Sequence, residues 1–423
     1  MVFVLVVGGN SAASQISDIS IVVGSLALFV LAIRYGAWTE LAALSWWQKS
    51  LLISAFAVPA IQLAPLPPFL WQALPAREGA TLLRETLGHG SQWFPISLDP
   101  IATANDWFFL LIPLGVASAA LTFDRVQLRL LLGLICMVAI ASIVLGSIQL
   151  ASRGAGAVIY DHAPTGILLG FFPNRNHEAL FLAICFALGF NLAERIRPPM
   201  RLAVRFGLVV VTLAAVLGTA SRAGLVLTVV SMILCFAWSA QRGTIDRRLV
   251  WGGSAVAFIG LLVGFFSFSR VAQGTLDRYS TLSDDARFDI WRKSLGLLEN
   301  HYFAGSGFGT YVPLYKQTET LEEMSPYFVN HAHNDYIELA IEGGVLATLP
   351  ALVFSIAVVV ALGRLFLARQ DGLRYVALLG IALMLAHSLF DYPLRTPALA
   401  ALFGCLLAVA LSPRAGNSAI TDE

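Results

Sequence analysis

Long apolar runs dominate the chain, and short polar stretches separate them. A helix needs about 20 apolar residues to cross a bilayer. Runs of about that length cover residues 19–35, 47–68, 106–122, 129–150, 166–193, 203–220, 223–240, 249–268, 336–363, 374–391 and 395–411. A shorter apolar run, 1–9, precedes them and is typical of a short first span. The pattern therefore predicts an all-α polytopic membrane protein with about twelve transmembrane helices.

Arginines indicate the orientation of these spans. They gather in three short connections: Arg195, Arg197, Arg201 and Arg205; Arg242, Arg247 and Arg248; and Arg364, Arg369 and Arg374. Because positively charged loops remain in the cytoplasm, we expect these connections and both termini to be cytoplasmic. Segments 72–105, 151–165 and 269–335 then lie on the far side. We expect one integral-membrane domain, 1–423, with the polar segment 269–335 as a large loop inserted between spans.

Composition agrees with a membrane protein and excludes several classes. Hydrophobic residues make up 57% of the chain and charged residues 13%, a balance that a water-soluble fold cannot bury. The net charge of +1 gives no basic surface for nucleic acid, which we exclude as a partner. The four cysteines, Cys136, Cys185, Cys235 and Cys405, lie singly inside apolar runs, so we interpret them as packing residues.

Polar groups near the expected outer boundary are candidates for function, because such groups are costly at membrane depth. Residues 171–178 interrupt one apolar run, with Pro173 breaking or starting a helix. One interpretation is a pocket lip that presents Arg175 and His177. The alternative is a helix that begins at the membrane interface, with the polar ends of its first side chains reaching toward water.

A second candidate is Arg222. The stretch 205–242 is too long for one span and has small residues, 218–221, before Arg222 at its middle. We therefore expect a tight outer hairpin. A guanidinium at this boundary suits bidentate binding of phosphate. The alternative is that Arg222 only anchors the helix at the membrane interface, since such a residue would have the same position.

The third candidate is a pair of histidines, His331 and His333, at the entry to the span 336–363. Histidine suits proton transfer near neutral pH, and Asp335 and Glu338 are close enough in sequence to orient an imidazole. Two exposed loop histidines are the alternative. No third metal ligand stands at a recognisable spacing, so we expect no metal site.

A last polar stretch, 387–395, forms the apex between the final two spans. Its charged residues are Asp391 and Arg395. We expect these two side chains to pair with each other.

Taken together, these stretches resemble the O-antigen ligase family, which also contains O-antigen polymerases and protein O-oligosaccharyltransferases. No single motif is specific to this family, but the order in which the motifs follow one another over residues 170–345 is specific to it. The matching pieces are Asn174-Arg175-Asn176-His177, Thr219-Ala220-Ser221-Arg222, Arg287-Phe288-Asp289-Ile290-Trp291, Gly305-Ser306-Gly307-Phe308-Gly309, Ala332-His333-Asn334-Asp335-Tyr336 and Glu342-Gly343-Gly344.

The resemblance implies a glycosyltransferase C-like fold and an inverting transfer, independent of metal or other cofactor, at the periplasmic face of a bacterial inner membrane. The donor would be a glycan on undecaprenyl pyrophosphate. The acceptor would be a lipid A–core sugar in a ligase. By matched position, His333 would be the catalytic base, and Arg222 and Arg287 would hold the pyrophosphate. Further substrate-binding candidates are Arg175, His331 and Asn334.

Two other functions remain open at this point. A polymerase of the same family would use the same donor and pass the glycan to another lipid-linked repeat. A transporter would place its charges near mid-membrane, often with repeat symmetry. Here the notable polar groups gather on one face and no repeat is visible, which favours an enzyme.

Overall fold

The computed structural model describes residues 1–10, 15–152, 164–244, 283–323 and 329–412, with a few isolated positions between them. Within these ranges, seven helices are long and apolar enough to cross a membrane: Ile19–Ala42, Pro100–Leu121, Arg125–Ala151, Arg175–Arg195, Met200–Gly218, Arg222–Gln241 and Asp335–Ala368. Gly372–His387 and Pro397–Leu411 are shorter apolar helices. The chain is thus a mostly helical, multi-pass membrane protein. The expected count of about twelve spans stays a prediction, and most of 249–268 lies outside the described residues.

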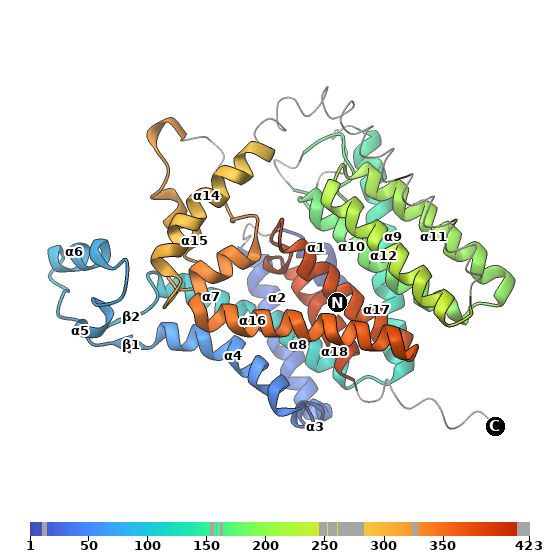
Figure 1. The fold of residues 1–423 in the computed structure, drawn as a ribbon, viewed down its shortest axis with the longest axis horizontal. Helices are drawn as coiled ribbons and strands as arrows, with labels where there is room; N and C mark the ends of the chain where they lie inside the picture. Colours follow the sequence, from blue (N-terminus) through green and yellow to red (C-terminus); the bar gives the residue numbers. More distant parts are fainter. Residues whose placement is uncertain are drawn as a thin grey trace.

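The first half of the chain contains most of the short elements (Figure 1). In order they are α1 (Val2–Val7), α2 (Gln15–Ala32), a π-helical turn (Ile33–Ala37), α3 (Trp38–Ala42), α4 (Trp46–Leu63), β1 (Pro65–Leu66), α5 (Pro68–Trp71), α6 (Glu78–Thr86), β2 (Phe94–Pro95), α7 (Pro100–Phe109), α8 (Leu111–Leu121) and α9 (Arg125–Ala151). The α4 helix ends before the predicted residue 68, because Pro65 and Pro67 cannot continue its hydrogen-bond ladder.

The second half begins with α10 (Arg175–Leu192), a 3₁₀ turn (Ala193–Arg195), α11 (Pro198–Gly218) and α12 (Arg222–Gln241). The remaining elements are α14 (Ser283–His301), α15 (Tyr311–Lys316), a 3₁₀ turn (Leu321–Glu323), α16 (Asp335–Ala368), α17 (Gly372–His387), a 3₁₀ turn (Pro393–Arg395) and α18 (Pro397–Leu411). The predicted hairpin is confirmed. Its turn contains Ala220 with φ of 58°, and Ser221 caps α12 by accepting a hydrogen bond from the Gly224 amide.

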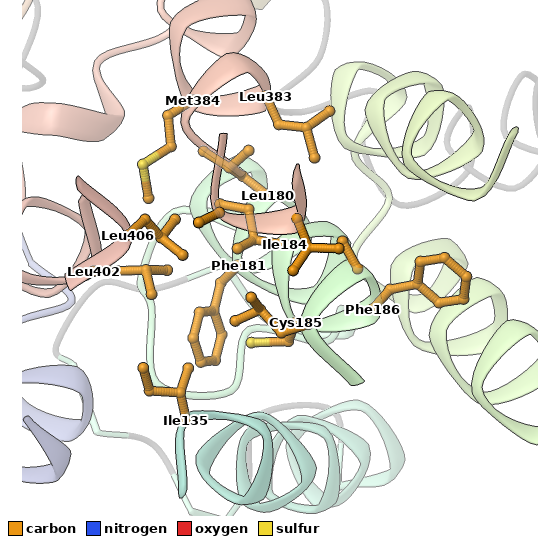
Figure 2. Close-up of a cluster of buried hydrophobic side chains, with 14 of the residues drawn as sticks. Ile135, Leu180, Phe181, Ile184, Cys185, Phe186, Leu383, Met384, Leu402 and Leu406 are labelled. Atoms are coloured by element: carbon orange, nitrogen blue, oxygen red, sulfur yellow. The ribbon is translucent and has the colours of Figure 1, made fainter. Parts of the chain in front are cut away.

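The core is built around α10, which is buried from Asn176 to Leu188. It packs against α9, α11, α12 and α17. Figure 2 shows Phe181 and Ile184 of this helix among side chains of α9, α17 and α18. Cys185, Cys235 and Cys405 are buried and Cys136 is partly buried, all as free thiols, which confirms their packing role.

Helix α16 differs from α10 because most of its apolar surface faces outward. Leu349, Leu352 and Val359 are each more than half exposed, as expected of side chains that meet lipid. The helix bends at Gly344, whose φ of 62° favours glycine. The bend separates a short polar start from the long apolar part.

The glycine-rich loop 305–309 packs against this bend. The amides of Ser306 and Gly307 donate to the carbonyls of Ile341 and Glu342, each at 3.0 Å. A Cβ atom at Gly305 would lie 2.3 Å from the Glu342 carbonyl oxygen, so only glycine fits there. The glycine motifs at 305–309 and 342–344 therefore pack directly against each other and connect the loop to α16.

The segment that carries β1, α5, α6 and β2 joins the same region. The Leu98 amide donates to the Ser306 carbonyl at 2.8 Å, and the Arg77 guanidinium donates to the carbonyls of Ile96 and Gly305. These elements gather with α14 and α15 at one end of the molecule, on the left in Figure 1. Parts of segments 72–105 and 269–335 thus pack together. The side of the membrane on which they lie stays a prediction.

Candidate active site

The carboxylate of Asp391 lies fully buried in the turn between α17 and α18 and joins three parts of the chain. Its Oδ2 accepts hydrogen bonds from the side-chain amides of Asn176, at 2.8 Å, and Asn174, at 3.2 Å. Its Oδ1 lies 3.2 Å from Nδ1 of His333. One side chain therefore links the start of α10, the loop before α16 and the apex before α18.

The charge of Asp391 fixes the tautomer of His333. Burial opposes ionisation, but the hydrogen bond from His333 and the neighbouring imidazoles outweigh it and hold the pKa of Asp391 well below its ordinary value. Because a carboxylate only accepts hydrogen bonds, Nδ1 of His333 must donate. The Nε2 atom then carries the lone pair that can accept a proton.

Two further histidines lie beneath this pair. The Nε2 atoms of His177 and His387 are each 4.0 Å from Oδ2 of Asp391, and both side chains are buried. The expectation that His177 is presented at a pocket lip is wrong, since the first turn of α10 points this side chain into the core. Arg175, one of the expected pair, is partly exposed as the first residue of α10.

The backbone around His333 is unusual. His333 has φ of 50°, in the left-handed region that non-glycine residues rarely adopt, at a typical cost of about 1–3 kcal/mol. The next residue, Asn334, caps α16 by accepting from the amides of Tyr336 and Ile337, and it donates to the Leu389 carbonyl at 3.1 Å. The cap holds the strained turn in place. It also occupies both polar atoms of Asn334, which was expected to bind substrate.

His331 belongs to a second network. Its Nδ1 lies 2.9 Å from Oε1 of Glu338, whose Oε2 accepts from the Ala332 amide at 2.8 Å. Glu338 is also 3.1 Å from Arg395. Of the two carboxylates expected to orient an imidazole, Glu338 does so by direct contact, whereas Asp335 accepts from Ser388 at 2.8 Å.

Arg395 is surrounded by carboxylates. Besides Glu338, its guanidinium lies 2.9 Å from Glu342, 3.5 Å from Asp335 and 3.9 Å from Asp106. Burial lowers the pKa of Arg395, but these carboxylates outweigh it and raise the pKa well above its ordinary value. The prediction that Asp391 and Arg395 pair with each other is wrong. The helical spacing of residues 335, 338 and 342 offers Arg395 one acidic face of α16, while Asp391 turns toward α10.

The ring of Tyr392 separates the two histidine networks. Its centroid is 4.2 Å from that of His331 and 5.1 Å from that of His333. Its hydroxyl accepts a hydrogen bond from Asn330 at 3.3 Å. The aromatic ring therefore spaces the two imidazoles and keeps their carboxylate partners apart.

The expected arginines lie at the beginnings of helices near Asp391. Arg222 is exposed as the first residue of α12. The preceding Ser221 donates to Oδ1 of Asn176 at 2.7 Å, and Asn176 in turn donates to Asp391. Arg287, on α14, is partly exposed and close enough to His387 to act on it electrostatically. Backbone amides and the helix dipole at the starts of α10 and α12 also favour anions.

A family model described as O-antigen ligase matches residues 207–352. This match supports the resemblance of the chain to the O-antigen ligase family. The matched region contains five of the expected site residues, Arg222, Arg287, His331, His333 and Asn334. A comparison with curated proteins found no match. Within the described residues, no group of three or more histidine, cysteine, aspartate or glutamate side chains has the geometry to hold a metal ion.

Sequence reasoning missed several residues of this candidate site. Asp391, Asn176 and Ser221 form the connection between the hairpin and His333, but they are distant from one another in the sequence. Asp391 was noticed only as the partner of Arg395. The signal available was an acidic residue, Asp391, in a short connection between two apolar spans. Its partners lie at the start of α10, and they reach Asp391 only because α10 packs against α17 in the fold.

Proposed function

We propose that this protein is a membrane glycosyltransferase of the O-antigen ligase type. It transfers a glycan from undecaprenyl pyrophosphate to a lipid A–core sugar at the periplasmic face of a bacterial inner membrane, with inversion. One observation carries the proposal: the imidazole of His333, held by a buried carboxylate, stands beside the helix starts that bear Arg175 and Arg222. The family match is consistent with this class of reaction.

The reaction is a displacement at the anomeric carbon. The acceptor hydroxyl attacks that carbon, and Nε2 of His333 takes the hydroxyl proton. The bond from the anomeric carbon to the pyrophosphate oxygen breaks, and its electron pair stays on that oxygen. A positioned base contributes about 10²–10⁴-fold in rate. Asp391 stabilises the imidazolium that forms.

The arginines act on the leaving group. Negative charge grows on the pyrophosphate as the glycosidic bond breaks, so guanidinium groups stabilise the transition state more than the ground state. Arg222 and Arg287 hold the two phosphates, and Arg175 adds positive charge at the start of α10. This chemistry requires neither a divalent cation nor an organic cofactor.

A polymerase is the second candidate, because the family that the chain resembles also contains O-antigen polymerases. Its acceptor would be another lipid-linked repeat. Deletion in the native cell separates the two functions. Loss of a ligase leaves polymerised glycan on the undecaprenyl carrier, whereas loss of a polymerase leaves single repeats.

Reconstituted transfer tests the proposal. Purified protein in lipid nanodiscs is supplied with undecaprenyl-pyrophosphate-linked glycan and lipid A–core, and the glycosylated acceptor is quantified. Wild-type protein and Glu323→Gln, a change in an exposed ion pair with Lys293, should both form product. Transport of glycan or another solute into liposomes, without transfer to either acceptor, would overturn the proposal in favour of a transporter.

A further inference from the structure

Helix α14 carries an aromatic pair that the proposed reaction does not use. The pair is Phe288 and Trp291, one turn apart, with ring centroids separated by 5.9 Å and ring planes at 73°. Trp291 is partly buried, whereas Phe288 is 69% exposed. The two rings therefore meet edge to face, and most of the Phe288 ring is open to solvent.

The packing of α14 places this pair beside the catalytic loop. The buried side of α14 packs on the apolar cluster that contains Ala332. The indole Nε1 of Trp291 donates a hydrogen bond to the Ala332 carbonyl at 3.0 Å. Ala332 stands between His331 and His333. Trp291 therefore joins α14 directly to the loop that carries the proposed base.

Arg287 lies on the same side of the helix as Trp291. The two residues are four positions apart, so their side chains leave α14 in similar directions, about one helical turn from each other. In the proposed reaction Arg287 holds a phosphate of the leaving group, and the first sugar is bonded directly to that pyrophosphate. A sugar attached to a pyrophosphate on Arg287 is therefore expected beside Trp291 and Phe288.

The chemistry of this surface suits a sugar ring better than a lipid chain. Asp289 follows Phe288 in the chain, and Arg292 lies one turn further along the same side. Their side chains are 57% and 76% exposed, so this part of α14 faces water. A pyranose has hydroxyl groups around its edge and a face of C–H groups. That face can stack on an aromatic ring while the hydroxyl groups stay hydrated.

We propose that Phe288 is a stacking surface for the first sugar of the lipid-linked donor, and that Trp291 positions this surface beside the catalytic loop. The inference rests on the proposed function and adds a glycan subsite to the groups that hold the pyrophosphate. A hydroxyl group that points out of the ring plane would hold the sugar away from the aromatic face. The subsite therefore favours a sugar that has at least one face of C–H groups.

Binding of two donor forms, without acceptor, tests the inference separately from catalysis. Dissociation constants are measured for purified protein in nanodiscs with bare undecaprenyl pyrophosphate and with the glycan-linked form. Wild-type protein should bind the glycan-linked form more tightly. Phe288→Leu should weaken binding of that form by about tenfold, the size of one lost aromatic contact, and leave binding of the bare form unchanged. Phe288→Trp should keep both affinities, since it supplies another flat ring.

Phe303→Leu is the matched control, because Phe303 is 73% exposed and lies beyond the end of α14. It should leave both dissociation constants unchanged. Leucine keeps an apolar side chain at position 288, so a contact with lipid alone would survive the change. Equal affinity of wild type and Phe288→Leu for the glycan-linked form, or an equal loss for both forms, overturns the inference and leaves the proposed function intact. Failure of wild-type protein to bind either form would instead defeat the proposed function.

Discussion

Two histidines separated by one alanine make different contacts. His333 donates to Asp391, a carboxylate surrounded by side-chain amides and imidazoles. His331 contacts Glu338, a carboxylate that shares Arg395 with three other acids. Tyr392 lies between the two imidazoles. The task of each ring is thus set by the network behind it.

The comparison also explains why the two carboxylates are not interchangeable. Asp391 is held by groups that come from α10 and from the loop before α16, so it connects His333 to the arginine-bearing hairpin. Glu338 is held by Arg395 and the Ala332 amide, so it connects His331 to α7 and the apex. Breaking either network should therefore affect a different histidine.

The largest effect is expected from His333→Ala. Loss of the base should reduce transfer by about 10²–10⁴-fold, while the protein inserts and accumulates normally, since this side chain is 24% exposed. His331→Ala should be milder, at about tenfold, because a single hydrogen bond to a charged group is lost. Near-normal transfer by His333→Ala, measured as glycan on the acceptor in cells, would show that the base is another residue.

The next largest effect is expected from Asp391→Asn, which should lower the transfer rate by about 10²-fold or more. An amide can donate to Nδ1 of His333, which would place the ring proton on Nε2 and remove the lone pair that accepts the acceptor proton. Initial rates of the purified variant measure the loss, and its thermal melting checks the fold. A rate within threefold of wild type would contradict the assigned tautomer.

The low pKa of Asp391 has a consequence for the pH dependence of the wild-type enzyme. A depressed pKa in the folded protein means that this carboxylate stabilises the fold above the unfolded value of about 3.9, and that the stabilisation is lost as pH falls through the folded value. Asp391 therefore stays ionised near neutral pH. A loss of transfer rate as the pH falls from 7 to 6 would therefore come from a group other than Asp391.

Arg222→Lys and Arg287→Lys should each lower transfer by about tenfold. Lysine keeps the charge but loses the planar fork that binds two phosphate oxygens. Arg292→Lys is a matched control, because Arg292 is 76% exposed and pairs with Asp289 on the same helix as Arg287. Full activity of both Arg222→Lys and Arg287→Lys would show that these two arginines only anchor their helices at the membrane interface.

The smallest effect is expected from metal removal. EDTA should leave the transfer rate unchanged, because the proposed mechanism uses the guanidinium groups of Arg222 and Arg287 to stabilise the charge on the pyrophosphate. Asp284-Asp285 is an adjacent acidic pair on the predicted outer loop. Strict dependence on added magnesium or manganese would contradict this mechanism.

The sequence predicted local features better than long-range ones. The small residues 218–221 predicted the hairpin, and the order of motifs pointed to His333 and Arg222 within a region that matches the O-antigen ligase model. The pairing of Asp391 with Arg395 failed, because proximity along the chain was taken for contact. The real partners of Asp391 come from α10, which is placed by its packing against α17. No local pattern encodes that arrangement.

One measurement tests the shared site most directly: a cryo-electron microscopy structure with an undecaprenyl pyrophosphate-linked sugar analogue that cannot be transferred. The account predicts that the pyrophosphate lies between the guanidinium groups of Arg222 and Arg287. It also predicts that Nε2 of His333 faces the anomeric carbon from the acceptor side. A pyrophosphate bound elsewhere, with Arg222, Arg287 and His333 opening onto separate surfaces, would contradict it.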